Sequence, residues 1–171
     1  MDTLPGMAAI APAEETGSTF EENAIQKALY YSIHCDGLLF VDDSGLEVDA
    51  LVGAPGVYSA RFAGPEATDE ENNRLVLEGM RGVRERTSRF VCVVALARGG
   101  ELVRTFRGVV EGVLLDKPRG PNGFGYDPLF FYPPFACSFG EAQLEEKMRV
   151  SHRGQALRAM LSYLQPPIAS K

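Results

Sequence analysis

Acidic residues at two places in the chain could bind a divalent metal. The pair Glu14-Glu15 lies near the N-terminus, and Asp42-Asp43 precedes a Ser-Gly dipeptide. A few carboxylate oxygens, completed by water and phosphate oxygens, form the environment that Mg²⁺ prefers. Consecutive side chains of a strand point to opposite faces, so only one of Asp42 and Asp43 would face a given site, while the other would cap or brace the turn. The alternative for Glu14 and Glu15 is that they are ordinary solvated surface charges.

Residues 123–128 combine glycine, aromatic and acidic side chains in a way that suits a flat ligand. Glycine lets the backbone approach a ligand closely, and the rings of Phe124 and Tyr126 could stack on a nucleobase. Asp127 could accept hydrogen bonds from ring nitrogens. A tight structural turn with core aromatics would have the same composition, so this segment alone leaves both interpretations open.

Basic residues gather near the predicted start of the last helix. Lys147 is followed by Ser151, His152 and Arg153. A helix N-terminus presents free N–H groups and a positive dipole end, so these side chains could bind a phosphate or an electron-rich carbonyl oxygen. The chain has 2 histidines; His34 is interpreted as structural, since a histidine and a neighbouring cysteine do not complete a metal site.

The elements that must position these residues follow from hydrophobic spacing and capping signals. Thr19 with Glu22, and Thr68 with Glu71, fit capping boxes that open two helices. Helices are predicted over residues 20–34, 68–80, 141–148 and 151–164, the last one stopped by Pro166-Pro167.

Strands are predicted between these helices. A short strand over residues 37–41 ends in a glycine turn at 42–45, which would place the aspartates where α/β folds bind ligands. Residues 89–97 and 101–107 form a hairpin around Gly99-Gly100, residues 108–115 add a third strand, and residues 129–132 a short one. Residues 52–65 and 118–128 are predicted loops. The pattern indicates an α/β fold with a mixed sheet flanked by helices, without repeats or a domain linker.

The composition limits the functions that the chain can have. A length of 171 residues, 45% hydrophobic, suits one globular domain. The formal net charge of −6 argues against a nucleic acid polymer as partner. No apolar run approaches the roughly 20 residues of a membrane helix, and residues 1–13 do not form a secretory signal. We therefore expect a cytoplasmic protein that does not bind membranes. The 3 cysteines are interpreted as structural.

Taken together, the segments resemble the inosine triphosphate pyrophosphatase family, which removes deaminated purine nucleoside triphosphates from the nucleotide pool. The resemblance runs in order from Glu14 to the C-terminus. The matching stretches are residues 14–28, 42–50, 53–61 and 122–128, then Glu146-Lys147 followed by 151–154. It implies an elongated fold with two lobes and a central cleft, usually a homodimer. It also implies Mg²⁺-dependent hydrolysis of ITP, dITP or XTP to the monophosphate and pyrophosphate.

The resemblance also implies roles for individual residues. Asp43 would hold the metal and activate water, and Glu14 or Glu15 would be the second metal ligand. Lys27 would contact the phosphates, and Ser44 would line the site. The base would be cradled by Phe124, Gly125, Tyr126 and Asp127, with an aromatic ring stacked on it. Lys147, His152 and Arg153 would complete the base pocket and part of the phosphate contacts.

Selection of deaminated bases then has a physical explanation. Hypoxanthine and xanthine carry a carbonyl oxygen where adenine has an amino group. Lys, His and Arg donors suit that oxygen and leave adenine poorly paired, which can discriminate by several orders of magnitude. Guanine has the same oxygen, so its rejection must depend on its 2-amino group.

The N-terminal residues depart from the family pattern, which opens with a strand, an Asn- and Lys-containing phosphate loop and a helix. Residues 1–13 contain no Lys, Arg or Asn. We therefore expect an N-terminally short domain, without the first strand and helix of the family fold. A second hypothesis is a truncated, catalytically weak or inactive relative that binds nucleotide or dimerises. An aspartyl-phosphate phosphatase ranks last, because Asp42 and Asp43 are adjacent rather than separated by one residue. A phosphate-binding loop of the Walker type is absent from the sequence.

Overall fold

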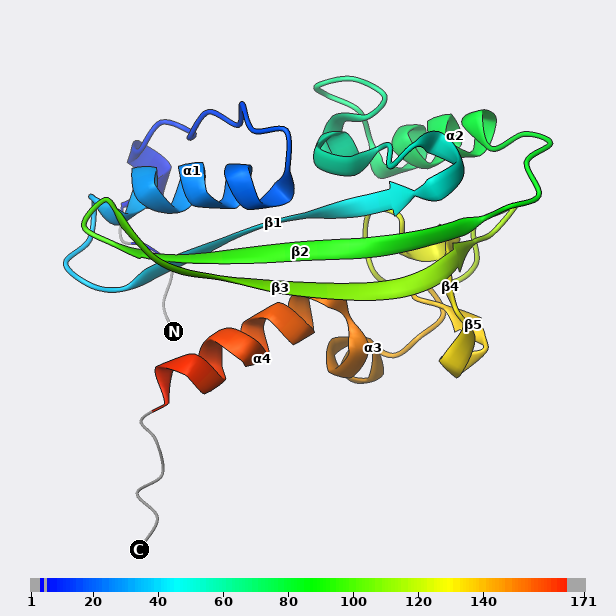
Figure 1. Ribbon diagram of the computed structural model, residues 1–171. Coiled ribbons are helices and arrows are strands. Elements are labelled where there is room, and N and C mark those ends of the chain that lie inside the picture. Colours follow the sequence, from blue (N-terminus) through cyan, green and yellow to red (C-terminus); the bar gives the residue numbers. More distant parts are fainter. Residues whose placement is uncertain (1–3, 5, 166–171) are drawn as a thin grey trace, which may run out of the picture.

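A five-stranded sheet forms the centre of the computed structural model, which describes residue 4 and residues 6–165. The strands are ordered β1-β2-β3-β4-β5, and every neighbouring pair is antiparallel. Their bounds are Leu39–Val48 for β1, Thr87–Arg98 for β2, Glu101–Leu114 for β3, Phe130–Tyr132 for β4 and Cys137–Ser138 for β5. The first three strands are long and give the molecule its elongated shape (Figure 1).

The predicted α/β class is confirmed, but the described sheet is antiparallel rather than mixed. The hairpin turn at Gly99-Gly100 requires antiparallel strands, because two residues can only reverse the chain. The long segment between β1 and β2 contains a helix, yet it also returns the chain in the opposite direction. The alternation of helices and strands along the chain therefore does not produce parallel strand pairs in this sheet.

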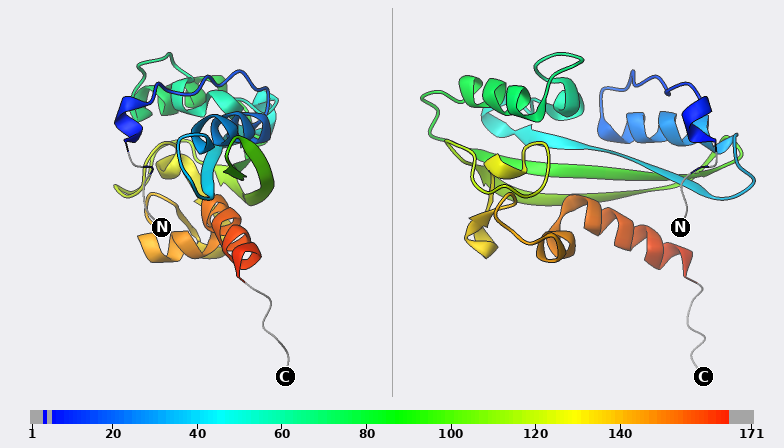
Figure 2. Two further views of the ribbon diagram at one scale, coloured as in Figure 1. Left: turned by 90° about the vertical axis from the view of Figure 1, so that its left-hand side faces the viewer. Right: turned by 180° about the vertical axis from the view of Figure 1, so that it is seen from behind.

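Helices cover both sides of the sheet. They are α1 (Phe20–Ser32), α2 (Asp69–Gly79), α3 (Leu144–Val150) and α4 (His152–Leu164). Short 3₁₀ helices are η1 (Met7–Ala9), η2 (Asp49–Leu51), η3 (Gly56–Arg61), η4 (Asp127–Leu129) and η5 (Pro133–Phe135). Figures 1 and 2 show α1 and α2 on one side of the long strands and α3 and α4 on the other. Within the described residues no helix has the length and apolarity needed to span a membrane.

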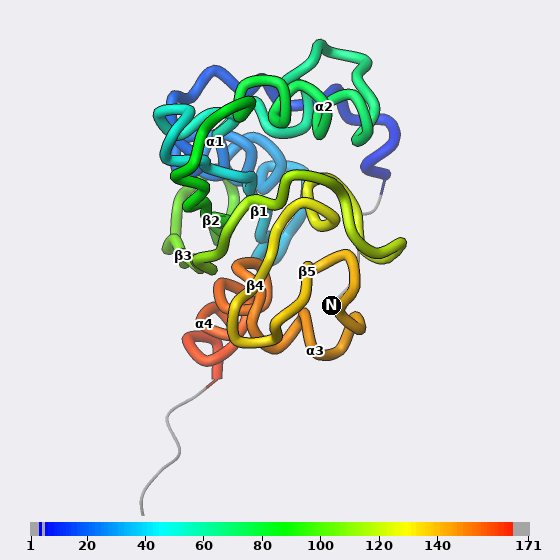
Figure 3. The backbone as a smooth tube through the Cα atoms, turned by 90° about the vertical axis from the view of Figure 1, so that its right-hand side faces the viewer, coloured from blue at the N-terminus to red at the C-terminus, as the bar shows by residue number. Residues whose placement is uncertain are grey.

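The two ends of the sheet carry different layers. Phe20, Ala24 and Ala28 of α1 pack on alternate residues of β2, and Ala156 and Met160 of α4 pack on its other face. At the far end, α2 and the segment from the end of β3 to β5 enclose a third cluster, which contains the fully buried Leu46 and Phe130. Figure 3 views that end, with α2 above and α3 below. Between the start of α1 and η3 lies a recess of about 440 Å³, whose lining contains none of the predicted site residues.

The prediction that β1 ends at a glycine turn was wrong. β1 continues through Asp42, Asp43, Ser44 and Gly45, in unbroken register with β2 from Leu39 opposite Ala97 to Val48 opposite Ser88. The pairing satisfies the backbone polar groups of this polar stretch. Its two carboxylates form ion pairs with basic residues of the helices on either face of the sheet, Lys27 of α1 and Arg153 of α4.

The prediction of a separate third strand over residues 108–115 was also wrong, since β3 is continuous from Glu101 to Leu114. Gly108 faces α4 instead of breaking the strand. A Cβ atom there would collide with the backbone oxygen of His152 and would lie 2.9 Å from the Cβ of Gln155. The missing side chain therefore lets the first turn of α4 approach the sheet closely.

Local signals at the helix ends were largely correct. Thr68 and Glu71 form the complete capping box of α2, and Ser151 caps α4 by accepting from Gly154 N. At α1 only half of the predicted box forms: Thr19 accepts from Glu22 N, while the Glu22 carboxylate accepts from Ser18 N and Oγ. The reason is that Ser18 offers two donors to the same carboxylate. α1 ends at Ser32, and Pro166-Pro167 lie outside the described residues.

The boundaries of three other predicted segments moved or proved incomplete. The helix expected over residues 141–148 runs from Leu144 to Val150. The predicted loop 52–65 contains the 3₁₀ helix η3. The short strand predicted at 129–132 is β4, which begins one residue later.

Candidate active site

Adjacent residues of β1 face two different clusters of polar side chains. Asp43 lies opposite Val93, which packs under α1, and Asp42 lies opposite Val94, which packs under α4. The prediction that the two aspartates point to opposite faces is therefore confirmed. We name the group around Asp43 the carboxylate–lysine cluster; its members are Glu15, Asn23, Lys27, Asp43 and Arg61. The group around Asp42 is the aromatic–cation cluster; its members are Asp42, Ser44, Phe124, Asp127, Lys147 and Arg153.

In the carboxylate–lysine cluster, one ammonium group links two carboxylates. Lys27 Nζ lies 2.7 Å from Asp43 Oδ1 and 3.0 Å from Glu15 Oε1. Asn23, one helical turn before Lys27, donates to Asp43 Oδ2 at 3.4 Å. Arg61 of η3 lies 3.2 Å from the second oxygen of Glu15. Both Lys27 and Asp43 are largely buried, with side chains 14% and 13% exposed, so these charges interact more strongly than surface pairs.

The charges of this cluster shift the three ionisation equilibria in different directions. Burial and the nearby Glu15 charge raise the pKa of Asp43, and Lys27 offsets only part of this increase. Burial opposes ionisation of Glu15, but Lys27 and Arg61 outweigh it and lower the pKa of that carboxyl. Burial likewise disfavours the charged form of Lys27, yet Asp43 and Glu15 raise its pKa. Glu15 and Lys27 thus stay charged, while Asp43 accepts a proton more readily than an exposed aspartate.

Of the two glutamates left open by the sequence, Glu15 belongs to the cluster. Glu14 is exposed and takes part in none of the ion pairs found among the described residues. The same residues contain no group of three or more His, Cys, Asp or Glu side chains that could enclose a metal. The position of Lys27 Nζ between Glu15 and Asp43 nevertheless shows that these two carboxylates favour a positive charge. Two carboxylates leave the other positions around a hard divalent cation to water or ligand oxygens, so the pair alone does not enclose a metal.

The aromatic–cation cluster is built around Phe124, a residue that is 63% exposed. Lys147 Nζ lies 5.0 Å and Arg153 Cζ 5.7 Å from the centre of this ring. Arg153 donates to Asp42 Oδ2 through Nε at 3.0 Å and through Nη2 at 2.9 Å, and to Ser44 Oγ at 3.0 Å. Asp42 thus braces this arginine rather than a turn. The result is a flat aromatic surface beside two cations.

The remaining predicted base-pocket residues lie deeper. Asp127 is buried, forms an ion pair with Lys147 and accepts from Phe124 N at 2.9 Å. Tyr126 belongs to the core, where its hydroxyl donates to Ser59 O at 2.8 Å. His152 stacks on Phe90 with ring centres 4.8 Å apart, and burial, together with Arg153 and Lys147, lowers its pKa to about 3. It is therefore a neutral imidazole at neutral pH, and its Nδ1 has no partner among the described residues.

The structure thus divides the predicted site residues between two faces of β1. Lys27, Asp43 and Glu15 meet on the α1 face, while Ser44 meets Lys147, Arg153 and Phe124 on the α4 face. Sequence reasoning missed Asn23 and Arg61 as members of the first cluster. Asn23 could have been found from its four-residue spacing to Lys27 on one helix, because side chains four apart share a face. Arg61 ends the matched stretch 53–61 without any local sign of its partner.

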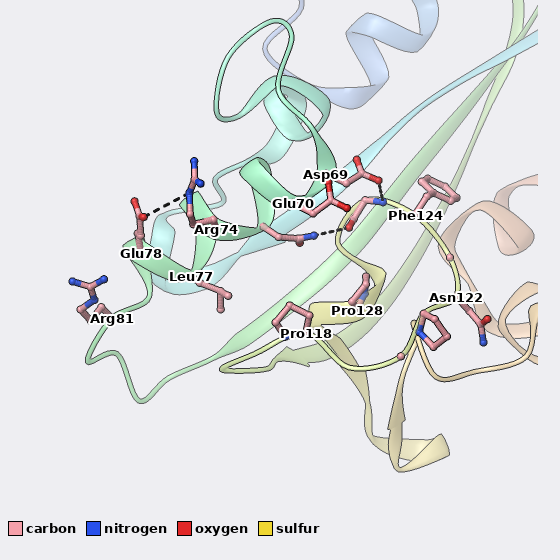
Figure 4. A pocket seen from close by; sticks show the side chains of 15 residues that line it. Asp69, Glu70, Arg74, Leu77, Glu78, Arg81, Pro118, Asn122, Phe124 and Pro128 are labelled. Atoms are coloured by element: carbon pink, nitrogen blue, oxygen red, sulfur yellow. Dashed lines mark hydrogen bonds and ion pairs between the residues drawn. The ribbon is translucent and has the colours of Figure 1, made fainter.

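A large cavity lies beside these clusters rather than in them. It measures about 590 Å³ and separates α2 from the loop of residues 118–128. Figure 4 shows Asp69 and Glu70 of α2 on one side, and Pro118, Asn122 and Phe124 of the loop on the other. Of the two clusters, only Phe124 reaches it. The candidate site is therefore identified by its two side-chain clusters and not by the volume of the neighbouring cavity.

Comparisons with known proteins point to one family. A model of the Ham1 family matches residues 1–163, which includes the N-terminal residues where we found no motif. A protein from Exiguobacterium sp. named dITP/XTP pyrophosphatase is 53% identical over 153 residues, covering 90% of this chain and 78% of that protein. One of the same name from Acidobacterium capsulatum is 50% identical, covering 94% of this chain and 84% of that protein.

Solved structures give the same result for the fold. The Ham1 protein of Staphylococcus aureus superposes with a TM-score of 0.87 at 39% identity, covering 92% of this chain and 82% of that one. A HAM1 protein from Coxiella burnetii gives a TM-score of 0.87 at 42% identity, with 91% and 81% covered.

Proposed function

The chain belongs to the Ham1 family, and from this premise we propose that it hydrolyses dITP, ITP and XTP to the monophosphate and pyrophosphate at the two clusters joined by β1. The observation that carries the proposal is the division of Asp42 and Asp43. One aspartate belongs to a cluster suited to phosphate and metal, and the next belongs to a cluster suited to a flat base bearing a carbonyl oxygen. The comparisons give no support to the alternative of a truncated, inactive relative.

The triphosphate would bind at the carboxylate–lysine cluster. Lys27 is charged and positioned to bind phosphate oxygens once they replace one of its carboxylate partners. Glu15 and Asp43 would hold Mg²⁺, which when bound neutralises phosphate charge and acidifies water. We assign Asp43 as the base that takes a proton from the attacking water, because its largely buried carboxylate lies beside the groups that would hold the metal and the phosphates.

The purine would stack on the exposed face of Phe124, where Lys147 and Arg153 lie at the ring. Both cations are donors only, so they suit the carbonyl oxygen of hypoxanthine and xanthine and repel the amino group of adenine. Asp42 and Ser44 fix the direction of the Arg153 guanidinium. His152, neutral and packed on Phe90, would form a rigid wall of the pocket and not an additional charge.

The oligomeric state, cellular location and metal of the enzyme follow from the same family resemblance. We propose a single domain that acts as a homodimer in the cytoplasm with Mg²⁺ as its metal, supported by the family resemblance. Sedimentation at several protein concentrations tests the dimer. Comparison of Mg²⁺ with Ca²⁺ in the assay tests the metal, because Ca²⁺ prefers more ligands and longer bonds.

Release of pyrophosphate from dITP, ITP, XTP, dATP and dGTP with Mg²⁺ tests the function directly. We expect dITP and XTP to exceed dATP in kcat/KM by at least about 10²-fold, as expected of a site built on hydrogen bonds to the base. Release of orthophosphate instead of pyrophosphate, or equal rates for dATP and dITP, would overturn the proposal. Asp43→Asn serves as the inactive control.

A further inference from the structure

Gly125, the residue after the exposed Phe124, is held through both of its backbone polar groups. Its N–H donates to Asp69 Oδ2 at 2.5 Å, and its carbonyl oxygen accepts from Asn73 Nδ2 at 2.9 Å. The backbone of Gly125 is left-handed, with φ +60°, a conformation in which glycine is the least strained residue and also the most mobile. Asp69 and Asn73 therefore restrain the backbone of Gly125, which has no side chain to limit its conformation.

The residues that restrain Gly125 come from α2, which contributes no residue to either cluster. Asp69 and Asn73 are four positions apart and so share one face of the helix. The capping box of Thr68 and Glu71 fixes the start of this helix, and Asn73 is only 7% exposed. Figure 4 shows the bond from Asp69 crossing to the loop at the rim of the large cavity.

The part of the loop around Phe124 is separated from α2 by a cavity of about 590 Å³. Packing against α2 begins only after Gly125, where Tyr126 joins the core cluster that contains Val76. Phe124 is 63% exposed, so its ring is not anchored in the core. Its position follows from its backbone, which is bonded to Asp127 on one side of the ring and to α2 through Gly125 on the other.

We propose that Asp69 and Asn73 are positioning residues, which hold the Phe124 ring beside Lys147 and Arg153 so that it can stack on the substrate base. This proposal rests on the proposed function, in which Phe124 contacts the base. Without either bond, the loop samples more conformations and the ring must be ordered when substrate binds. Preorganisation of this kind affects base binding and base selectivity and leaves the phosphate chemistry at Asp43 intact.

Steady-state kinetics with dITP test the proposal. Asn73→Ala loses the donor without burying a new charge, and Asp69→Ala loses the acceptor. We expect either change to raise KM about 3- to 10-fold, as expected for one lost hydrogen bond, with kcat within about twofold. Asp69→Asn keeps an acceptor oxygen and should restore most of the affinity. Glu70→Gln is the matched control, because Glu70 lines the same cavity but makes no side-chain hydrogen bond to the described loop residues.

A double-mutant cycle with Phe124→Ala separates positioning from general stability. If the bonds act through the ring, Asn73→Ala should change KM by less than about twofold once Phe124 is absent. If the KM increases of the two single variants simply multiply in the double variant, while the wild-type enzyme hydrolyses dITP normally, the positioning role is overturned and the proposed function is not. Absence of turnover by the wild-type enzyme would overturn the proposed function and the positioning role with it. Thermal unfolding midpoints and hydrogen exchange of the Gly125 amide show whether a variant has lost its fold or only this bond.

Discussion

Replacing Asp42 and Asp43 separately by asparagine should produce two different defects, although the residues are adjacent. Asp42→Asn changes the support of Arg153, and Asp43→Asn changes the partner of Lys27. Asparagine keeps the volume and one acceptor oxygen, so neither variant should disturb the paired strand β1. We expect Asp42→Asn to reduce base selectivity and Asp43→Asn to reduce turnover.

The magnitude for Asp42→Asn follows from its contacts. Arg153 makes two hydrogen bonds to Asp42, at 3.0 and 2.9 Å. A hydrogen bond to a charged group contributes about 1.5–3 kcal/mol and one to a neutral group about 0.5–1.5, so each bond weakens by about 1 kcal/mol. The side chains of Arg153 and Asp42 are 36% and 29% exposed. Solvent screening therefore reduces the total from about 2 to about 1 kcal/mol, or roughly a fivefold loss of selectivity.

The magnitude for Asp43→Asn is larger because the proposed base itself is lost. Removing a general base lowers kcat by about 10²- to 10⁴-fold. The base pocket lies on the other face of β1 and keeps all its contacts. The ratio of kcat/KM for dITP over dATP, taken from the residual turnover, should therefore stay within about twofold of the wild-type ratio.

Pyrophosphate release from dITP and dATP, measured at several substrate concentrations for the wild-type enzyme, Asp42→Asn and Asp43→Asn, distinguishes the two defects. The reasoning is refuted if Asp42→Asn lowers kcat as strongly as Asp43→Asn while the selectivity is unchanged. It is equally refuted if Asp43→Asn alters the choice of base. Either result would mean that the two faces of β1 do not serve separate parts of the substrate.

Three further predictions follow from the same contacts. Lys27→Met removes the cation that partly offsets the raised pKa of Asp43. The pH below which kcat/KM falls should therefore be higher in the variant than in the wild-type enzyme; an unchanged or lower pH contradicts the base role of Asp43. The pKa of His152 is lowered from 6.5 to about 3, so the folded chain binds fewer protons than the unfolded chain between these values and loses stability as pH falls through that window. Urea unfolding should show a smaller loss over this range in His152→Phe, and an equal loss would disprove the assignment. Gly108→Ala should lower stability by about 1–3 kcal/mol and also reduce dITP selectivity, because the new Cβ displaces the turn of α4 that carries Arg153. Gly37→Ala, where a Cβ meets nothing within 4 Å, is the control and should leave both unchanged.

Local patterns predicted much of the fold because they depend on neighbours in the chain. The caps of α2 and α4, the hairpin at Gly99-Gly100 and the opposite directions of Asp42 and Asp43 are all of this kind. The length of β1 was not predictable in the same way. A run of two aspartates, serine and glycine resembles a turn, and it forms a strand here because its charges are neutralised by Lys27, 16 residues away, and by Arg153, 111 residues away.

The site shows the same limit. Motifs identified Lys27, Asp43, Phe124 and Arg153 as candidates, and their proposed roles remain predictions. Whether Glu14 or Glu15 faces inward depends on Arg61, 46 residues away in the chain. The motif around Phe124 contains two rings, and only the packing of Tyr126 against the core leaves Phe124 as the exposed one.

The alternation of β1 also restricts how the length of this segment can change. Leu46 and Val48 are fully buried and fix the end of the strand. One residue inserted between Asp43 and Leu46 would turn the preceding part over and send each aspartate to the other helix layer. Two inserted residues would restore the faces but move both carboxylates about 7 Å along the strand. In the course of evolution this stretch could therefore exchange side chains more freely than it could gain or lose a residue.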